Sequence, residues 1–566
     1  MKEFRLKRGE KLLEIIKSFS ATEKVIFAFL TVVALISALS IASKVNSLFL
    51  VEVPANGGAF TEGMIGLPRT INPVLAFTDT DKDLTNLIYS GLMKYDRGEI
   101  VNDLAESYKI SEDGLVYSFK LKNDIRFHDG TQLTTDDVEF TIQKIQDGEL
   151  KSPRRVDWAS VSIKKINSLE IQFILKQPYA PFLTNTTIGI IPKNTWKNID
   201  TDQFIFNQAN LNPIGSGPYE VSGIDKDKDG TPVSYKLSSF DDYHNVQAYI
   251  SNINVNFYKN EDEIINAYKS GDIQNFAGIS PEKTHELANT NDLTVIHNPL
   301  PRIFGIFLNQ NNSPVLANKE VRQALDMAVD KEKIVKDVLY DYGISIDSPI
   351  ANDGKDSIKS DKVAAKNILA KAGWTINANG VLEKKVGSVK QTLDFSIVTA
   401  DSIELKKVAE MVKSDWEQIG AKVTVKIFEY GDLTQNVIKT RKYDALLFGE
   451  IINKDLDLYA FWHSSQRNSP GLNIAMYVNS KADKLLEEAR TTYDTKQKNA
   501  IYESFEKIIK SDVPAIFLYS PEYIYVMSDK IKGYHLESIT NHSDRFYGID
   551  KWYIDTNKVW KIFVKN

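Results

Sequence analysis

The segment Asn212-Pro213-Ile214-Gly215-Ser216-Gly217-Pro218-Tyr219-Glu220-Val221 holds two glycines between two prolines. Prolines fix φ, and this mixture excludes a helix. Gly215 and Gly217 permit either a positive φ or the close approach of another backbone segment. We therefore expect a sharp turn inside the protein, followed by a strand that begins at Tyr219. Such a turn suits the point where a long excursion ends and the chain re-enters a domain that it left earlier.

Length and composition limit the class of protein. The chain has 566 residues, of which 42% are hydrophobic and 25% are charged, so we expect a folded protein with more than one core. It contains no cysteine, which excludes disulfides, thiolate catalysis, zinc–thiolate sites and a lipid-modified N-terminal cysteine. The net charge is −6, and because residues 1–54 are basic the rest is mildly acidic. This balance argues against nucleic acid as a partner.

Residues 25–43, VIFAFLTVVALISALSIAS, carry no charge and have about the length of a membrane-spanning helix. Seven basic side chains precede this stretch, a bias that keeps residues 1–24 in the cytoplasm and the body outside it. Ser40-Ile41-Ala42 resembles a signal-peptide cleavage site, so a cleaved signal is the alternative to a retained anchor. The long basic region and long apolar run favour a retained anchor at the cell membrane. Residues 44–59 then read as a linker.

Hydrophobic periodicity predicts alternating strands and helices along the first half of the body. Strands are expected over 60–66, 117–121, 161–167, 170–175, 235–237 and 253–258. Helices are expected over 80–89, from Thr134 or Thr135 onward, and over 262–269, the last stopped by Gly271.

The second half predicts a mixed or parallel sheet covered by helices. After a strand over 304–309 comes one long amphipathic helix over 320–339. A β-α-β-α-β run follows, with strands over 393–398, 422–428 and 443–448 and a helix over 403–419. A helix over 482–511 and late strands over 515–519 and 523–527 complete the chain.

Seven segments in order, FHDGTQLTTDDVEF, QPYAPFL, IIPK, NPIGSGPYEV, VRQALDMAVDKEKIV, LAKAGW and RKYDALLFGE, resemble the family 5 extracellular solute-binding proteins. These are the peptide-binding and nickel-binding components of ABC importers. The resemblance runs from about Phe60 to the end and implies a bilobed, periplasmic-binding-protein-like α/β fold with an extra inserted lobe. Gram-positive members usually carry a lipid-anchor cysteine, whereas this chain has an apolar helix.

The resemblance also implies how the chain divides. Lobe I comprises residues 60–97, 212–304 and 520–566, lobe II is the insertion of residues 98–211, and lobe III comprises residues 305–519. Ligand is then enclosed between lobes I and III, which close on a hinge of two crossing strands.

Glu450 is the sharpest candidate for ligand contact. It follows the strand over 443–448, and ligands of open α/β sheets lie beyond the carboxyl ends of strands. A carboxylate there can pair with a ligand ammonium group, although a solvated loop acid is an equal alternative. The resemblance adds that peptide-binding members often place an aspartate near this point for a peptide's N-terminus.

Other candidates flank the expected cleft. Arg302 can meet a ligand carboxylate, with a structural ion pair as the alternative, and Asn309 can offer an amide to a ligand backbone. Phe77 and Thr78 can offer main-chain groups from lobe I. The resemblance places Trp462 and His463 near the ligand.

Three other patterns have ordinary explanations. Residues 225–230 begin like a calcium loop, yet Lys236 stands where the bidentate Glu is required, so we expect a hairpin turn. His128 with its neighbouring aspartates fits a turn and a helix start better than a metal site. His463 with Ser464 and Ser465 lacks an acid beside it, which argues against a catalytic triad.

These observations predict a binding protein that is not an enzyme, with no cofactor and no metal. We expect a membrane-anchored monomer that captures a small solute, most simply an oligopeptide, and delivers it to ABC permease subunits. A binder of nickel or another metal chelate is the alternative, although the seven histidines form no cluster by spacing. An anchored hydrolase is the third alternative.

Overall fold

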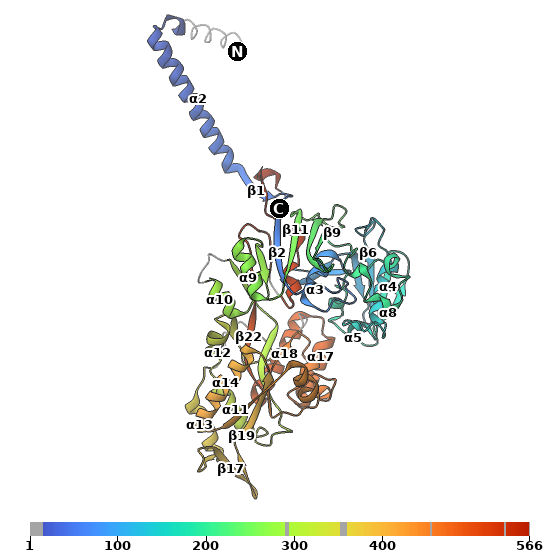
Figure 1. Ribbon diagram of the computed structural model, residues 1–566, viewed down its shortest axis with the longest axis vertical. Helices are drawn as coiled ribbons and strands as arrows, with labels where there is room; N and C mark the ends of the chain where they lie inside the picture. The colour runs from blue at the N-terminus through green and yellow to red at the C-terminus, as the bar shows by residue number, and fades with distance from the viewer. Residues whose placement is uncertain (1–14, 289–293, 351–358, 453–455, 537–538, 565–566) are drawn as a thin grey trace. The chain divides into compact units, whose positions relative to one another are not determined.

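The computed structural model describes residues 15–288, 294–350, 359–452, 456–536 and 539–564 (Figure 1). It divides into two compact units. One unit comprises residues 1–56 and 553–566, and the other comprises residues 57–552. Most of the expected cytoplasmic tail, residues 1–14, lies outside the described residues.

The smaller unit is built on the long apolar helix α2 (Ala21–Phe49). Ser20 and Glu23 form a capping box at its start, with the Glu23 carboxylate accepting the Ser20 amide at 2.8 Å. None of its side chains is buried, and it is long and apolar enough to cross a membrane. Strand β1 (Leu50–Pro54) follows at once and pairs antiparallel with β23 (Thr556–Trp560). Much of the stretch read as a linker is therefore regular structure.

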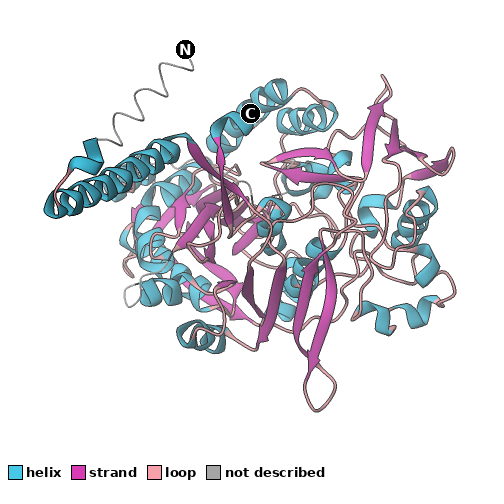
Figure 2. Cartoon of the chain, turned by 90° about the horizontal axis from the view of Figure 1, so that it is seen from above, coloured by secondary structure: helices cyan, strands magenta, loops and turns pink. Residues whose placement is uncertain are grey.

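The larger unit contains a 12-stranded sheet whose N-terminal half is organised around β2 (Ala59–Ile65). β2 pairs in parallel with β11 (Asn252–Tyr258) and with β12 (Asn275–Ala277). β10 (Pro232–Ser239) joins β11 to β9 (Tyr219–Lys226), and all three are antiparallel. Figure 2 shows helices packed around the strands of this unit.

Predicted local signals in this half are confirmed. Helix α3 (Asp79–Ile88) and helix α9 (Glu261–Ser270) lie where periodicity expects them, and Gly271 ends α9 with a φ of 83°. The segment that begins like a calcium loop forms the β9–β10 hairpin turn, in which the Asp227 carboxylate accepts the Thr231 amide at 2.9 Å.

The glycine turn is required by close packing, because neither glycine has a positive φ. A Cβ on Gly215 would lie 2.0 Å from the Ile88 carbonyl oxygen at the end of α3. The Gly217 amide donates to that same oxygen at 2.8 Å. The His128 ring is bound to this turn, since its Nδ1 accepts the Gly215 amide at 3.3 Å. The turn brings the chain back to the sheet, and β9 begins at Tyr219 as predicted.

A buried ionic cluster joins distant parts of the N-terminal half. The Arg545 guanidinium donates to Glu62 on β2 at 3.0 Å and to Asp83 on α3 at 2.7 Å. All three side chains are at most 5% exposed, and the Tyr525 hydroxyl also donates to Glu62. The cluster fixes the last part of the larger unit onto its first strand and helix.

Residues between α3 and the glycine turn form a separate antiparallel sheet. Its order is β5 (Ala105–Ile110), β6 (Val116–Leu121), β8 (Glu170–Ile174) and β7 (Ser162–Lys165). β7 and β8 pair antiparallel where strands are predicted over 161–167 and 170–175. Helix α4 (Thr135–Gln146) begins at its N-cap Thr134. The division into lobes I, II and III remains a prediction.

The C-terminal half of the large sheet has the predicted β-α-β order. β19 (Asp394–Ala400) lies between β20 (Lys422–Phe428) and β21 (Ala445–Ile451) and is parallel to both. Helix α14 (Ile403–Gln418) makes the first crossover. Beside β21, β14 (Arg302–Leu308) runs antiparallel.

Two helices predicted to be continuous are broken. The helix expected over 320–339 is α11 (Lys319–Ala328) and α12 (Lys331–Leu339). Val329 is extended, and Asp330 caps α12 while its own amide donates to Asp415 at 3.0 Å. The helix expected over 482–511 is likewise α17 (Ser480–Thr491) and α18 (Thr495–Asp512), with Asp494 as the new N-cap.

A single strand connects the two halves of the sheet. β22 (Ala515–Val526) merges the two late strands predicted over 515–519 and 523–527. Its first part pairs with β14, and its second part pairs with β12 and β13 (Val295–Pro299). Between them the Leu300 amide donates to the Pro521 carbonyl at 3.0 Å. We call this place, residues 299–302 against 519–523, the strand crossing.

Candidate functional site

A pocket of about 260 Å³ opens at the strand crossing. Side chains from both halves of the large sheet line it, among them Glu261, Arg302, Phe304, Glu404, Tyr519, Tyr523 and His542. The Phe304 and Tyr519 rings stack with centroids 5.0 Å apart. A stacked aromatic wall with charged groups around it can hold an amphipathic ligand by its apolar and its ionic parts.

Glu450 lies on β21, paired across the ladder with Ile303 of β14. It is 4% exposed, and no described group donates a hydrogen bond to either carboxylate oxygen. Burial raises the pKa of Glu450 well above its usual range. A buried, unpartnered carboxyl group is costly unless it is protonated or meets a cation. The residue is therefore suited to a cationic group that arrives with a ligand.

Arg302 stands at the start of β14, opposite Ile451, the residue after Glu450. Its Nε is buried and has no hydrogen-bond partner among the described residues. Burial lowers the pKa of Arg302, and Asp79 at the start of α3 opposes that shift. Burial also lowers the pKa of His542, which interacts electrostatically with Asp79 and Arg302. Arg302 thus retains a free donor beside the pocket, as the sequence hypothesis requires.

Phe77 and Thr78 precede α3. The Phe77 side chain is 76% exposed. Thr78 is the N-cap of α3, with its hydroxyl accepting the Asp81 amide at 3.1 Å and its own amide donating to the Asp81 carboxylate. The Ala76 amide donates to the Asn72 carbonyl at 2.7 Å. The exposed feature of this segment is the Phe77 ring, whereas the Thr78 groups hold the helix start.

Asn309 follows β14 at the end opposite Arg302. It is 1% exposed, and its amide nitrogen donates to the Arg441 carbonyl at 2.9 Å. Its side-chain oxygen accepts the amides of Asn311 and Asn312. These bonds close the turn after the strand, and seven strand residues separate it from Arg302 by roughly 20 Å. The structure does not bring Asn309 to Arg302, and it places Glu450 and Arg302 on opposite faces of the sheet, since Glu450 pairs with Ile303 and Arg302 with Ile451.

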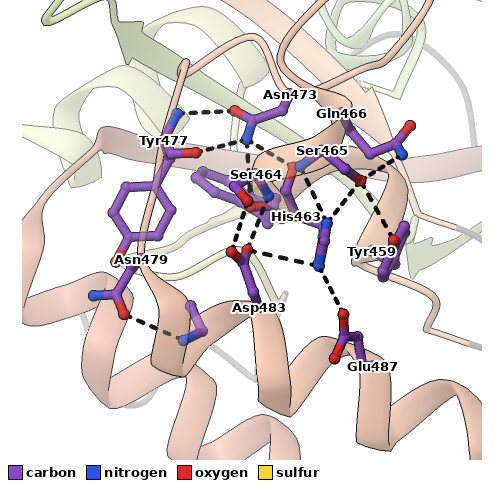
Figure 3. Close-up of polar contacts among 12 residues, drawn as sticks. Tyr459, His463, Ser464, Ser465, Gln466, Asn473, Tyr477, Asn479, Asp483 and Glu487 are labelled. Atoms are coloured by element: carbon purple, nitrogen blue, oxygen red, sulfur yellow. Dashed lines mark hydrogen bonds and ion pairs between the residues drawn. The ribbon is translucent and has the colours of Figure 1, made fainter.

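Trp462 and His463 lie at the end of the short helix α16 (Tyr459–Trp462). Trp462 is fully buried, and its ring packs 5.7 Å from Phe517. The His463 ring stacks on Tyr459 at 4.1 Å and accepts the Ser465 amide through Nδ1 (Figure 3). Its Nε2 faces Glu487 of α17 at 3.3 Å. Both side chains are thus occupied in fastening this loop to the core and to α17.

The serines beside His463 are also held by α17. The Ser464 hydroxyl donates to Asp483 at 2.7 Å, as does its amide at 2.8 Å (Figure 3). Among the described residues, no three histidine, aspartate or glutamate side chains gather in a way that could hold a metal ion. The sequence-based interpretation that His463 has no acid beside it is wrong, because the Ser465 hydroxyl meets its Nδ1 at 2.8 Å and its Nε2 faces Glu487 at 3.3 Å and Asp483 at 3.9 Å.

Sequence reasoning missed a second polar centre at Asp457, just before α16. The Arg490 guanidinium donates to the Asp457 carboxylate at 3.1 Å, and the Tyr179 hydroxyl donates to it at 3.3 Å. The carboxylate is 9% exposed. Asp457 also lines a cavity of about 360 Å³ together with Tyr95, Arg154, Asp157, Tyr179, Asn541, Asp544 and Tyr547. An acid soon after a buried strand was the only sequence signal for it.

Arg490 and its neighbour Tyr493 also contact residues 114–180. The Ala180 amide donates to the Arg490 carbonyl at 3.1 Å, and the Arg490 guanidinium lies over the Tyr179 ring. The Tyr493 hydroxyl meets the Tyr117 hydroxyl at 3.4 Å and the Gly114 carbonyl at 3.5 Å. We call these contacts of Arg490 and Tyr493 with residues 114–180 the latch.

Comparisons with known proteins agree on one family. Residues 99–472 match the family described as "Bacterial extracellular solute-binding proteins, family 5 Middle". The oligopeptide-binding protein AppA of Bacillus subtilis is 31% identical over 88% of this chain and 92% of its own length. The dipeptide-binding protein of Escherichia coli is 23% identical over 84% and 92%.

Solved structures give the same result. AppA from Bacillus subtilis in complex with a nonapeptide has a TM-score of 0.67 and 29% identity, covering 89% of this chain and all of that one. NikZ from Campylobacter jejuni in complex with Ni(L-His) has a TM-score of 0.68 and 25% identity, covering 88% and 99%.

Proposed function

This chain belongs to the bacterial extracellular solute-binding proteins of family 5, and from that premise we propose that it captures an oligopeptide outside the cytoplasm for an ABC permease. Members of this family bind peptides or nickel and serve ABC importers. An oligopeptide is favoured here because the oligopeptide-binding relative is 31% identical over nearly the whole chain. An extended peptide can be held through its backbone while solvated pockets accept varied side chains.

Glu450 is the observation that carries the proposal. Its carboxyl group is buried and has no described partner. It lies on the sheet face opposite Arg302, because Glu450 pairs with Ile303 whereas Arg302 pairs with Ile451. A peptide with a free amine supplies the ammonium group that Glu450 lacks. The pairing would release the penalty of a desolvated acid only when the correct ligand is bound.

Calorimetry with two matched peptides tests this pairing. A nine-residue peptide with a free amine and its N-acetylated form are titrated into the full chain and into Glu450→Gln. Loss of one partner of a buried ion pair should weaken binding of the free-amine peptide by about 3 kcal/mol, roughly a hundredfold. The acetylated peptide should bind the two proteins equally, because it brings no ammonium group.

Equal loss for both peptides would indicate damage to the fold, and no loss for either would remove Glu450 from the site.

A nickel chelate is the second candidate, because NikZ with bound Ni(L-His) is similar over most of this chain. A histidine that chelates nickel through its amine has no ammonium group left, so such a ligand would not satisfy Glu450 as a free-amine peptide does. Titration of Ni(L-His) in the same calorimeter distinguishes the two ligands, since only one should bind at micromolar concentration.

We also propose that α2 is retained as a membrane anchor with the larger unit outside the cytoplasm. Residues 25–43 of the helix carry no charge, and basic residues precede them. Replacing both Leu30 and Val33 by Lys should prevent insertion, because each charge near a helix centre costs about 2.5–3.5 kcal/mol. The matched control is Leu30→Ile with Val33→Ile.

Fractionation of cells reads out the result. The lysine variant should leave the membrane fraction while the isoleucine variant stays in it. Persistence of the lysine variant in membranes would exclude α2 as the anchor. Mass spectrometry of the mature N-terminus decides separately whether the helix is cleaved after Ala42.

A further inference from the structure

The C-terminal tail carries exposed apolar side chains at its end. Trp560, Ile562 and Phe563 are 46%, 76% and 75% exposed. Lys558 and Lys561 are interspersed with them and are exposed as well. Aromatic and aliphatic side chains alternating with lysines are typical of the interface between a bilayer's hydrocarbon core and water. Lysine stems cover apolar surface there while their charged ends reach the phosphates.

The tail lies against the last turns of α2. Strand β23 pairs with β1 so that Trp560 stands opposite Leu50, and the Trp560 ring stacks on Phe49 with centroids 6.3 Å apart. A groove of about 510 Å³ runs between the helix and the tail, lined by Ala42, Val45, Asn46, Phe49, Trp560, Lys561 and Ile562. The exposed apolar cluster is thus continuous with the apolar surface of the helix.

Helix geometry sets the depth of this cluster in a bilayer. At 1.5 Å per residue the uncharged stretch of residues 25–43 is about 28 Å long, close to the hydrocarbon thickness of about 30 Å. Lys44 then marks the outer edge of the hydrocarbon. Phe49 lies about 7 Å beyond it, within the headgroup layer. Trp560, stacked on Phe49, lies at the level where membrane proteins concentrate tryptophan.

We propose that residues 558–564 dock in the outer-leaflet headgroup layer, where phospholipid chains fill the groove beside Phe49. The inference rests on the proposed retention of α2 as an anchor. Lys558 and Lys561 face the lipid phosphates, and the Ile562 and Phe563 side chains enter the upper hydrocarbon. The smaller unit is thereby attached to the membrane at two points, the helix and the tail.

Site-directed fluorescence tests the docking in the full-length chain, which has no native cysteine to interfere. Phe563→Cys is labelled with the environment-sensitive dye NBD and reconstituted into vesicles of phosphatidylcholine and phosphatidylglycerol. Some of these lipids carry a nitroxide quencher near the headgroup. Asn557→Cys, an exposed polar position on the same strand, is the matched control. Val33→Cys reports separately on insertion of the helix.

The label at 563 should be quenched by the lipid nitroxide about twofold or more compared with the label at 557, with a blue-shifted emission. Equal quenching at 563 and 557, with the label at 33 in lipid, would overturn the docking and leave the anchor intact. A label at 33 that lipid quenchers do not reach would overturn the anchor and the docking together.

Discussion

Burial without a partner makes Glu450 unfavourable for the ligand-free protein at neutral pH. Its folded pKa is raised above the unfolded value, so its contribution to stability is complete below the unfolded pKa. That contribution is lost as the pH rises through the folded pKa. Glu450→Met, which needs no hydrogen bonds, should therefore stabilise the ligand-free chain by about 1 kcal/mol or more at pH 7.5 and less at pH 5.

Thermal unfolding of detergent-solubilised protein measures this difference. Glu112→Met is the control, because Glu112 is exposed and should respond little at either pH. A wild-type chain more stable than Glu450→Met at pH 7.5 without ligand would mean that the carboxylate has a partner in solution. Higher stability combined with lost binding is expected where a residue serves a ligand at the expense of the fold.

Proton release on binding is a second expectation for Glu450. A ligand ammonium group pairs with the carboxylate, so it binds the deprotonated form and displaces the proton that burial retains. Affinity for a free-amine peptide should rise between pH 5 and pH 7, up to about tenfold per unit while the free protein's carboxyl is protonated. Calorimetry in two buffers with different ionisation enthalpies should show proton release for the wild type and none for Glu450→Gln. Proton uptake would contradict the pairing.

The residue scale also shows where sequence reasoning stops. Glu450 was chosen because a strand's carboxyl end can be recognised in the sequence; the structure shows that it is buried, and its contact with a ligand stays a prediction. Asn309 was chosen by the same rule, but its side chain is consumed in closing its own turn. The partners of His463 lie on a helix 20 or more residues later, and no local pattern indicates them. The pairing of Glu62 with Arg545 spans nearly the whole chain and was equally invisible.

At the scale of elements, the glycine turn is fixed by contact with the end of α3. Gly215→Ala would bring a Cβ to 2.0 Å from the Ile88 carbonyl oxygen, and backbone cannot move aside as a side chain can. We expect a loss of about 3 kcal/mol in the free energy of unfolding, at the upper end for overpacking. Gly223→Ala on β9 is the matched control, because its Cβ would meet nothing closer than 3.5 Å.

Urea unfolding of both variants decides the matter. A loss for Gly215→Ala within about 0.5 kcal/mol of that for Gly223→Ala would show that α3 and the turn separate easily.

The sequence predicted a turn with close approach or a positive φ, and only the fold reveals that close approach is the reason. The break between α11 and α12 likewise depends on a tertiary contact that the sequence pattern does not show. Val329 fits an apolar stripe perfectly well, and the break comes from Asp330, whose amide is held by Asp415 from another helix.

At the scale of the whole molecule, the bilobed α/β fold implied by the motifs is confirmed by matches over most of the chain. Local patterns alone predicted the separate β-α units and could not join them, because β22 pairs with strands from both halves. The latch was also beyond prediction. It depends on Arg490 and Tyr493 at the junction of α17 and α18, a place that periodicity treated as the middle of one helix.

The latch should control how long a ligand stays. Tyr493 contacts Tyr117 and Gly114, and neither of these is a candidate ligand residue, so we expect its loss to affect closure rather than the site. Tyr493→Ala should weaken peptide binding about tenfold, mainly by faster release, because the ligand-bound closed state loses contacts that the open state never made.

Tyr108→Ala is the control, since Tyr108 stacks on Phe119 within its own sheet. Stopped-flow release of a fluorescent peptide measures both variants. Unchanged release from Tyr493→Ala would show that closure rests on the strand crossing alone, whereas a slower association rate with unchanged release would place the tyrosine in the path of ligand entry.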